Sequence, residues 1–257
     1  GGVGFIQHGV RVATNGDVRL ELTPGQFQPI PKVGPRTVDK ENNVITVKLW
    51  YPDSAINRKG FNPIFYPDLT FTYQIRVVGE KDYFKIYVDM DKPVPAEWEG
   101  KIGFNLELFP YDLFGKTWMM DAKSGFFPPQ ANGPVDGDQA VPMATGKKLV
   151  VAPEEDKQRF SIESATADLQ LLDGRIRHSN GWFVVRSAIP SGATKNAIEW
   201  TVKVNRIPGW KAEPVVHTSQ VGYHPGQSKT AVIELDAADR NISNVSLVKI
   251  TGEDKES

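Results

Sequence analysis

The sequence contains no cysteine among its 257 residues. Disulfide bonds, thiolate metal sites and cysteine nucleophiles are therefore excluded. No apolar run approaches the ~18–20 residues that a membrane-spanning helix needs, so we expect no membrane span. The formal net charge is −1, from 30 basic and 31 acidic residues in mixed order. This balance argues against nucleic acid or an anionic membrane as the main partner.

Several chemical motifs are also missing. The histidines show neither His-x-His nor His-Glu-x-x-His spacing, so a zinc site is not expected; they are His8, His178, His217 and His224. No Gly-x-Ser-x-Gly elbow and no phosphate-binding loop occur. The first ten residues, GGVGFIQHGV, lack a basic segment followed by an apolar one. We therefore expect that any signal peptide was removed or was never present.

Alternation of apolar and polar residues is the strongest pattern present, and long helical periodicity is nearly absent. The clearest case is Asp82–Met90, where Phe84, Ile86, Val88 and Met90 share one face. Similar alternation predicts further strands, ended by Gly, Pro, Asn-Gly and Asp-Gly turns. These are Val44–Tyr51, Phe71–Val78, Lys101–Phe109, Lys148–Ala152, Arg159–Glu163, Asp168–Asp173, Gly181–Ser187 and Asn196–Asn205. About ten strands in the first 210 residues indicate an all-β, antiparallel β-sandwich.

A second, smaller module is predicted at the carboxyl end. The sandwich ends with RIPGW at 206–210, and residues 211–214 read as a linker. Three more strands are expected at Val215–Val221, Thr230–Asp236 and Val245–Ile250. We therefore divide the chain into a sandwich over 1–210 and an incomplete immunoglobulin-like domain over 215–257.

Aromatic side chains on the polar faces of strands are candidates for carbohydrate binding, because pyranose rings present apolar C–H faces that stack on aromatic rings. Trp50, Tyr83 and Tyr87 fall on such faces. Tyr83 and Tyr87, four residues apart on one strand face, would lie ~13 Å from each other. The alternative is that these rings pack in the core or in a domain interface, as most large aromatics do.

The segment 109–143 has no clean periodicity and is rich in aromatics, Gly and Pro. Such a long loop is usually functional or else packs as a lid over the core. Five of its residues could line a sugar-binding groove with ring faces, amides and carboxylates: Tyr111, Trp118, Asp121, Gln130 and Asn132. Trp118 is expected in a connection between strands.

Carboxylates are numerous, and two of them ~5–10 Å apart could form a glycosidase pair. Sequence spacing does not establish that distance, and solvated turn residues are the alternative. Asp136-Gly137-Asp138 offers hard oxygen ligands for Ca²⁺. A plain turn is the competing interpretation, since no later Glu completes a calcium loop. No cofactor is expected otherwise.

One stretch resembles a known family. The segment SQVGYHPGQSKTAVI, over Ser219–Ile233, is similar to the start of the immunoglobulin-like domain that precedes the catalytic domain in glycoside hydrolase family 9 enzymes. Upstream, FNLELFPYDLFGKTWMMD, GFFPPQANGP, ATGKKLVVAPE, LQLLDGR and NGWFVVRS resemble an amino-terminal β-sandwich module of Bacteroidetes-type members. The catalytic barrel of that family and its Asp-x-Gly-Asp motif are not in the sequence.

The resemblance implies that this chain is the front of a longer enzyme, interrupted inside its second domain. The parent would be an inverting endo-β-1,4-glucanase at the bacterial cell surface, in the periplasm or outside the cell. The chain would then be a non-catalytic region that braces the catalytic domain or holds β-glucan near it. The alternative is a stand-alone β-supersandwich lyase or hydrolase that uses the 109–143 loop.

Overall fold

The computed structural model describes residues 2–20, 29–53, 67–137, 139–176, 181–239, 245–251 and 254–256. The chain divides into two compact units, Gly1–Ile207 and Pro208–Ser257. Among the described residues, no helix has the length and apolarity that a bilayer crossing requires.

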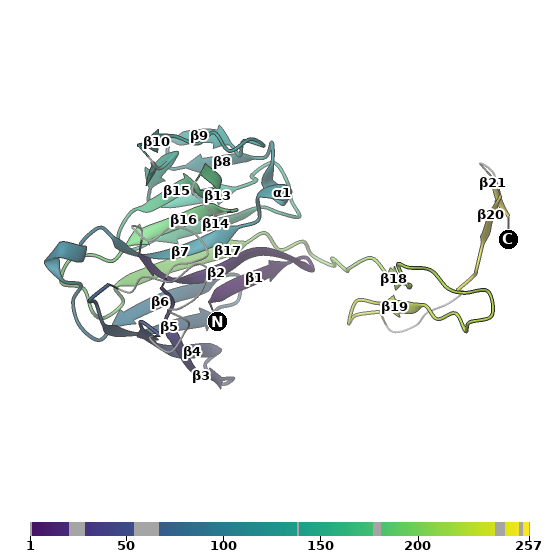
Figure 1. The fold of residues 1–257 in the computed structure, drawn as a ribbon, viewed down its shortest axis with the longest axis horizontal. Coiled ribbons are helices and arrows are strands. Elements are labelled where there is room, and N and C mark those ends of the chain that lie inside the picture. The colour runs from purple at the N-terminus through teal and green to yellow at the C-terminus, as the bar shows by residue number, and fades with distance from the viewer. Residues whose placement is uncertain are drawn as a thin grey trace. The chain divides into compact units, whose positions relative to one another are not determined.

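The first unit is a sandwich of two antiparallel sheets (Figure 1). The six-stranded sheet has the order β1-β2-β7-β16-β15-β12. Its strands are β1 (Val3–Gln7), β2 (Val10–Leu20), β7 (Ile102–Leu108), β16 (Phe183–Ala188), β15 (Leu169–Asp173) and β12 (Ala144–Gly146). The nine-stranded sheet has the order β3-β4-β5-β6-β17-β14-β13-β8-β9. Its strands are β3 (Lys32–Asp39), β4 (Val44–Tyr51), β5 (Phe71–Gly79), β6 (Phe84–Met90), β17 (Ile198–Val204), β14 (Phe160–Ser164), β13 (Lys148–Val151), β8 (Thr117–Met120) and β9 (Lys123–Phe126).

The predicted all-β antiparallel sandwich is confirmed, and alternation placed its strands well. In β6, Ile86, Val88 and Met90 are buried, while Lys85 and Tyr87 on the other face are only partly covered. A tight turn joins β5 to β6, whose register pairs Gly79 with Phe84. A pleated strand sends successive side chains to opposite faces, so the apolar half of each pattern enters the space between the sheets.

Three strands near the amino end, β1, β2 and β3, have no counterpart among the predicted strands. A bulge interrupts the pairing of β2 with β7 between Thr14 and Asp17. Another interrupts the pairing of β3 with β4 between Val33 and Arg36. Bulges shift the alternation by one residue, so the period-2 pattern is lost in the sequence.

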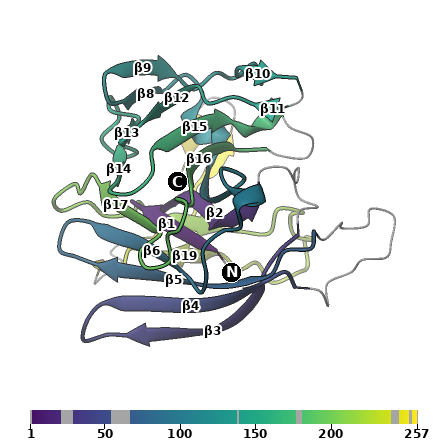
Figure 2. The same cartoon turned by 90° about the vertical axis from the view of Figure 1, so that its left-hand side faces the viewer.

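The 109–143 segment is a series of short elements rather than a long loop. It holds α1 (Pro110–Leu113), the β8–β9 hairpin, and a small hairpin of β10 (Val135–Asp136) and β11 (Gln139–Ala140). Because β8 pairs with β13, the hairpin widens the nine-stranded sheet at the end opposite β3 (Figure 2). The described part of the unit also holds two single 3₁₀ turns, η2 (Ala96–Trp98) and η3 (Gly174–Ile176).

The core lies between the two sheets and is rich in aromatic side chains. Trp200 of β17 is fully buried and meets Phe104 of β7 edge to face, with ring centroids 5.0 Å apart. Its indole N–H donates to the hydroxyl of Ser187 on β16. Phe5 of β1 packs edge to face against Phe160 of β14. Edge-to-face pairs of this kind add to the free energy gained by burying the rings.

The second unit contains two small hairpins. β18 (Val215–His217) pairs with β19 (Val232–Glu234), and β20 (Lys249–Thr251) pairs with β21 (Asp254–Glu256). These strands are shorter than the predicted Val215–Val221 and Thr230–Asp236. A β-strand with a neighbour on one side only has fewer hydrogen bonds to extend it.

Candidate functional site

The outer face of the nine-stranded sheet carries a polar cleft of about 340 Å³ across β4, β5 and β6. Its lining includes Lys48, Thr72, Gln74, Asp89 and Asp91. These groups converge because β4 and β6 flank β5, with Lys48 opposite Gln74 and Gln74 opposite Asp89. The Gln74 amide and the Asp91 carboxylate have no side-chain partner within the described ranges. Both remain available to a ligand.

Trp50 adjoins this cleft and is the best-placed aromatic side chain of those predicted to bind sugar. It lies opposite Thr72 in the register of β4 and β5, and 38% of it is exposed. The Lys48 ammonium lies 5.5 Å from its ring centroid. On β3, a Cβ atom added at Gly34 would come within 2.7 Å of the indole. Gly34 therefore lets the indole lie against the β3 backbone, which holds it in a defined position.

Tyr83 and Tyr87 do not form an open pair of stacking rings. Tyr83 precedes β6 and is 37% exposed, whereas Tyr87 is partly covered. The guanidinium carbon of Arg76 lies 4.6 Å from the Tyr87 ring centroid, and Lys85 approaches it at 5.9 Å. Two cations therefore approach the partly covered Tyr87 ring, whereas among the described residues only Lys48 approaches the more exposed Trp50 ring. Tyr87 thus offers a sugar less open surface than Trp50.

The charges around Tyr87 are paired with one another. Arg76 donates to Asp89 at 2.8 Å and to the side chain of Asn196 at 2.7 Å. Burial alone would raise the pKa of Asp89, but the hydrogen bonds from Arg76 and from the Asn196 N–H outweigh it and lower that pKa. Lys85 donates to Glu199 at 2.9 Å, and this hydrogen bond raises the pKa of Lys85. These residues brace the outer face of the sheet.

Trp118 does not lie in a connection, which corrects the expectation from sequence. It sits on β8 with only 6% of its surface exposed, and its indole N–H donates to the Phe126 carbonyl. A Cβ atom at Gly125 on β9 would lie 2.4 Å from the indole. The ring therefore packs against the hairpin and cannot present a face to a sugar.

Tyr111, in α1, is 86% exposed.

Asp121 is exposed but its carboxylate is engaged within the fold. Its two oxygens accept hydrogen bonds from the backbone N–H groups of Lys147 and Lys148, at 2.8 and 2.9 Å. Asp121 has a φ of 49° at the turn between β8 and β9. Aspartate tolerates this left-handed conformation better than most residues. The side chain thus ties the β8–β9 turn to the start of β13.

Gln130 and Asn132 are exposed, on a segment that Arg175 holds in place. The Arg175 guanidinium donates to the carbonyls of Pro128, Pro129 and Gln130, at 2.7 to 3.1 Å. It also pairs with Asp173, whose side chain is fully buried. The ring centroid of Phe183 lies 4.3 Å from the guanidinium carbon. This cluster closes the segment onto the sandwich and uses its carbonyl groups internally.

Within the described residues, the structure brings no further oxygen ligand to the calcium site predicted at Asp136-Gly137-Asp138. Asp136 lies exposed in β10, and Asp138 lies outside the described residues. Within the described ranges, no three Asp, Glu or His side chains are grouped so that they could hold a metal ion.

A buried carboxylate between the sheets was not predicted. Asp17 of β2 is 7% exposed and accepts a hydrogen bond of 2.5 Å from the Tyr73 hydroxyl of β5. Burial raises the pKa of Asp17, although the hydrogen bond from Tyr73 and the charge of Arg19 oppose the shift. Burial and the Asp17 charge together raise the pKa of Tyr73 well above its ordinary value. Asp17 follows the β2 bulge, so only the bulge geometry could have revealed its inward position.

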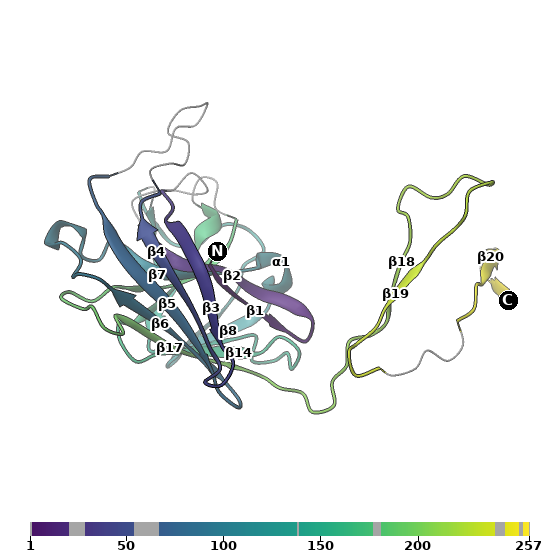
Figure 3. The ribbon, with the colours of Figure 1, turned by 90° about the horizontal axis from the view of Figure 1, so that it is seen from below.

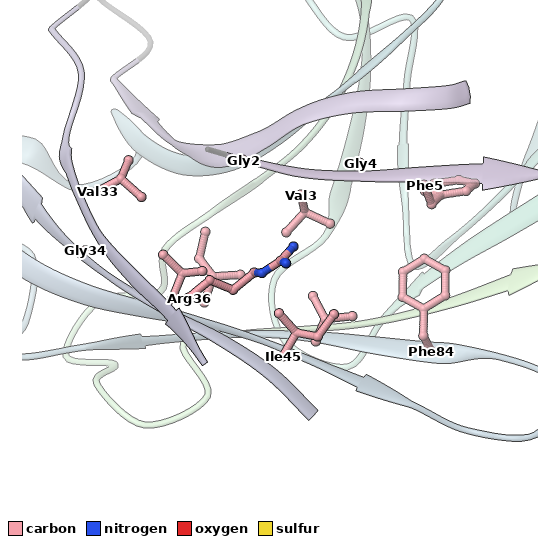
Figure 4. Close-up of a pocket in the computed structure, with 12 residues that line it drawn as sticks. Gly2, Val3, Gly4, Phe5, Val33, Gly34, Arg36, Ile45 and Phe84 are labelled. Atoms are coloured by element: carbon pink, nitrogen blue, oxygen red, sulfur yellow. The ribbon is translucent and has the colours of Figure 1, made fainter. Parts of the chain in front are cut away.

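A second cleft, of about 440 Å³, opens where the edges of the two sheets meet (Figure 4). Residues from β1 line one side, and residues from β3, β4, β5 and β6 line the other. Most are apolar, among them Val3, Val33, Ile45 and Phe84, and Arg36 is the single charged one. Figure 3 shows β1 and β3 at the same side of the sandwich.

No protein-family model and no curated protein matches this sequence.

Proposed function

We propose that this chain is the non-catalytic amino-terminal region of a family 9-like glycoside hydrolase, and that it braces the catalytic domain and binds β-glucan. The binding surface in this proposal is the cleft on the outer face of the nine-stranded sheet together with the adjoining Trp50 ring. This surface, called the Trp50 cleft, includes Lys48, Thr72, Gln74, Asp89 and Asp91. The parent enzyme would be an endo-β-1,4-glucanase in the periplasm, at the cell surface or outside the cell. The resemblance of Ser219–Ile233 supports the parent's class.

The observation that carries the binding role is the position of the exposed Trp50 ring beside Gln74 and Asp91, whose side chains have no side-chain partner in the described part of the chain. Its indole offers an apolar surface for the C–H face of a pyranose. The Gln74 amide and Asp91 carboxylate of the adjoining cleft can hydrogen-bond to sugar hydroxyls. An aromatic wall with a few convergent polar groups is typical of small-molecule sites.

The non-catalytic role is supported by how the 109–143 segment uses its polar groups. Asp121 holds backbone N–H groups of the next strand, and the carbonyls at 128–130 accept from Arg175. A stand-alone hydrolase acting through this segment would need carboxylates free to exchange protons with a substrate. The internal bonding of Asp121 and of the carbonyls at 128–130 instead favours a structural function for that part of the segment.

Affinity gel electrophoresis with cellulose derivatives, xyloglucan and mixed-linkage glucan tests the proposal. Retarded migration of the wild-type chain without release of sugar is the expected result. Trp50→Ala should remove most of the retardation, since loss of a stacking aromatic at a hot spot costs about 2 kcal/mol or more. Phe126→Ala is the matched control, because Phe126 on β9 is 60% exposed and outside the cleft.

Each of the other possible outcomes would favour a different function or binding surface. Release of product would favour the stand-alone enzyme. Migration unaffected by every glucan would leave bracing alone and remove the binding role. Retardation that Trp50→Ala leaves unchanged, but that Tyr83→Ala with Tyr87→Ala abolishes, would restore the tyrosine pair as the binding surface.

A further inference from the structure

The cleft between the sheet edges combines an apolar lining with one unpaired cation. Arg36 belongs to β3, and its register partner Val47 is a residue of the same lining. In Figure 4 its guanidinium reaches into the cleft between Val3 and Ile45. Within the described residues, Arg36 makes no hydrogen bond or ion pair, unlike Arg76 and Arg175 of the same unit.

The apolar lining is exposed because the two sheets differ in width. The nine-stranded sheet continues through β4 to β3, whereas the six-stranded sheet ends at β1. Inner-face residues near the β3 edge therefore lack a full opposing layer. Val33 is 43% and Ile45 39% exposed, and Val47, Val77 and Phe84 are half-buried. Apolar surface of this kind gains free energy when a ligand removes it from water.

The edge strands make addition of a peptide strand unfavourable. β3 carries Lys32, Pro35 and Arg36 together with a bulge, features that block edge-to-edge pairing. The pairing of β1 with β2 is also irregular, with register shifts between Val3 and Ile6. The cleft is thus better suited to a small molecule lying between the layers than to an extended peptide. Its volume falls within the range of small-molecule sites.

We propose that this cleft binds a small amphipathic anion, a molecule with an apolar chain or ring system and one carboxylate, with Arg36 pairing the carboxylate. The apolar body would contact Val3, Ile45, Val77 and Phe84. The guanidinium fork matches a carboxylate with two parallel hydrogen bonds. The Trp50 side chain is not part of this lining, although Gly34 of the lining also adjoins the indole. The inference therefore does not rest on the β-glucan proposal.

Titration of the full chain with sodium decanoate tests the site, with methyl chemical shifts of Ile45, Ile75 and Val77 as the reporter. Decanoate should bind and shift these methyl signals, and decan-1-ol should bind at least about tenfold more weakly. Arg36→Gln should weaken the affinity for decanoate by about tenfold, the loss expected for a charge-assisted hydrogen bond. The affinity for decanol should stay unchanged. Arg11→Gln is the matched control, because Arg11 is an exposed arginine of β2 outside the cleft lining.

A second variant, Val77→Phe, fills the cleft with a larger side chain and should abolish the binding of both compounds. Equal affinities for decanoate and decanol in the wild type, or an unchanged decanoate affinity in Arg36→Gln, would overturn the proposal. Shifts of the same methyl signals on addition of an acidic, apolar peptide, with no shifts from decanoate, would also overturn it, in favour of a protein partner. Glucan retardation in the same samples reports on the Trp50 cleft separately.

Discussion

The two units of this chain use apolar residues in opposite ways. In the first unit, apolar side chains from both sheets form a continuous buried core that includes Trp200, Phe104 and Leu106. In the second unit, no described side chain is buried, and Val221 and Leu247 are 98% and 99% exposed. The β18–β19 hairpin carries exposed polar contacts, such as the pair of His217 and Glu234 at 2.8 Å.

The comparison shows that strand-forming sequence alone does not produce a core. Both units contain alternating apolar residues, but among the described residues only the first unit buries them between two sheets. An isolated two-stranded hairpin is marginally stable in water. Exposed ion pairs such as Lys211–Asp239 add little to stability. Most of the folding free energy therefore resides in the first unit.

Native-state hydrogen exchange should give the largest contrast between the units. Amides of β17, at the centre of the nine-stranded sheet, should open only by global unfolding, with protection factors of about 10⁴ or more. Amides of β18 should exchange with protection factors of about 10 or less, because their hairpin has one partner strand and no buried face. Equal protection in β17 and β18 would show that the second unit has a core of its own.

Truncation of one apolar side chain in each unit compares how much the two units contribute to the free energy of unfolding. Trp200→Ala should lower the free energy of unfolding by about 3–5 kcal/mol, since it leaves a cavity between the sheets. Leu247→Ala should change it by less than about 0.5 kcal/mol, because the side chain is already in water. Urea denaturation followed by far-ultraviolet circular dichroism measures both. A Leu247→Ala effect above 1 kcal/mol would contradict the description of the second unit.

Polar clusters of the two units should also differ. Arg175→Met removes the partner of the fully buried Asp173 carboxylate and should cost about 3 kcal/mol. Lys211→Met in the second unit breaks an ion pair whose lysine side chain is 50% exposed. It should leave the urea transition of the first unit within about 0.5 kcal/mol of the wild type. Similar effects for the two substitutions would mean that Asp173 gains another partner or water when Arg175 is lost.

The smallest effect expected is one of pH. Burial raises the folded-state pKa of Asp17 above the unfolded value of about 3.9. As pH rises from the unfolded towards the folded pKa, the unfolded chain releases this proton first, so Asp17 lowers the stability of the first unit. Asp17→Asn should therefore gain stability relative to the wild type with rising pH, in urea denaturations between pH 4 and 8.

Asp236 of the second unit provides the control for this pH series. Hydrogen bonds from the backbone N–H groups of Ala212 and Ala238 lower its pKa, the opposite direction from Asp17. Asp236→Asn should leave the pH dependence of the first unit's transition unchanged. The opposite result would be a wild type whose stability increases relative to Asp17→Asn as pH rises. It would mean that the hydrogen bond from Tyr73 and the charge of Arg19 outweigh the cost of burying the Asp17 carboxylate.

Much of the sandwich could be predicted from regular alternation, and the candidate site only in part. Strands β4 to β7 and β13 to β17 follow clean period-2 patterns and were predicted within a few residues. Trp50 was correctly placed on the polar face of β4, where the structure also puts Lys48. The covering of Tyr87 by Arg76 could not be predicted, because it depends on the register of β5 against β6.

The sequence by itself determined the fold class and the faces of most strands, because alternation and turn residues act over a few neighbouring positions. Only the tertiary structure decided which strands became the wider sheet, which exposed the cleft at Arg36. It also placed Asp17 against Tyr73, buried Trp118 and joined Arg175 to the carbonyls at 128–130. These contacts join residues distant in sequence, and their geometry depends on sheet order and bulges, for which a local pattern carries no signal.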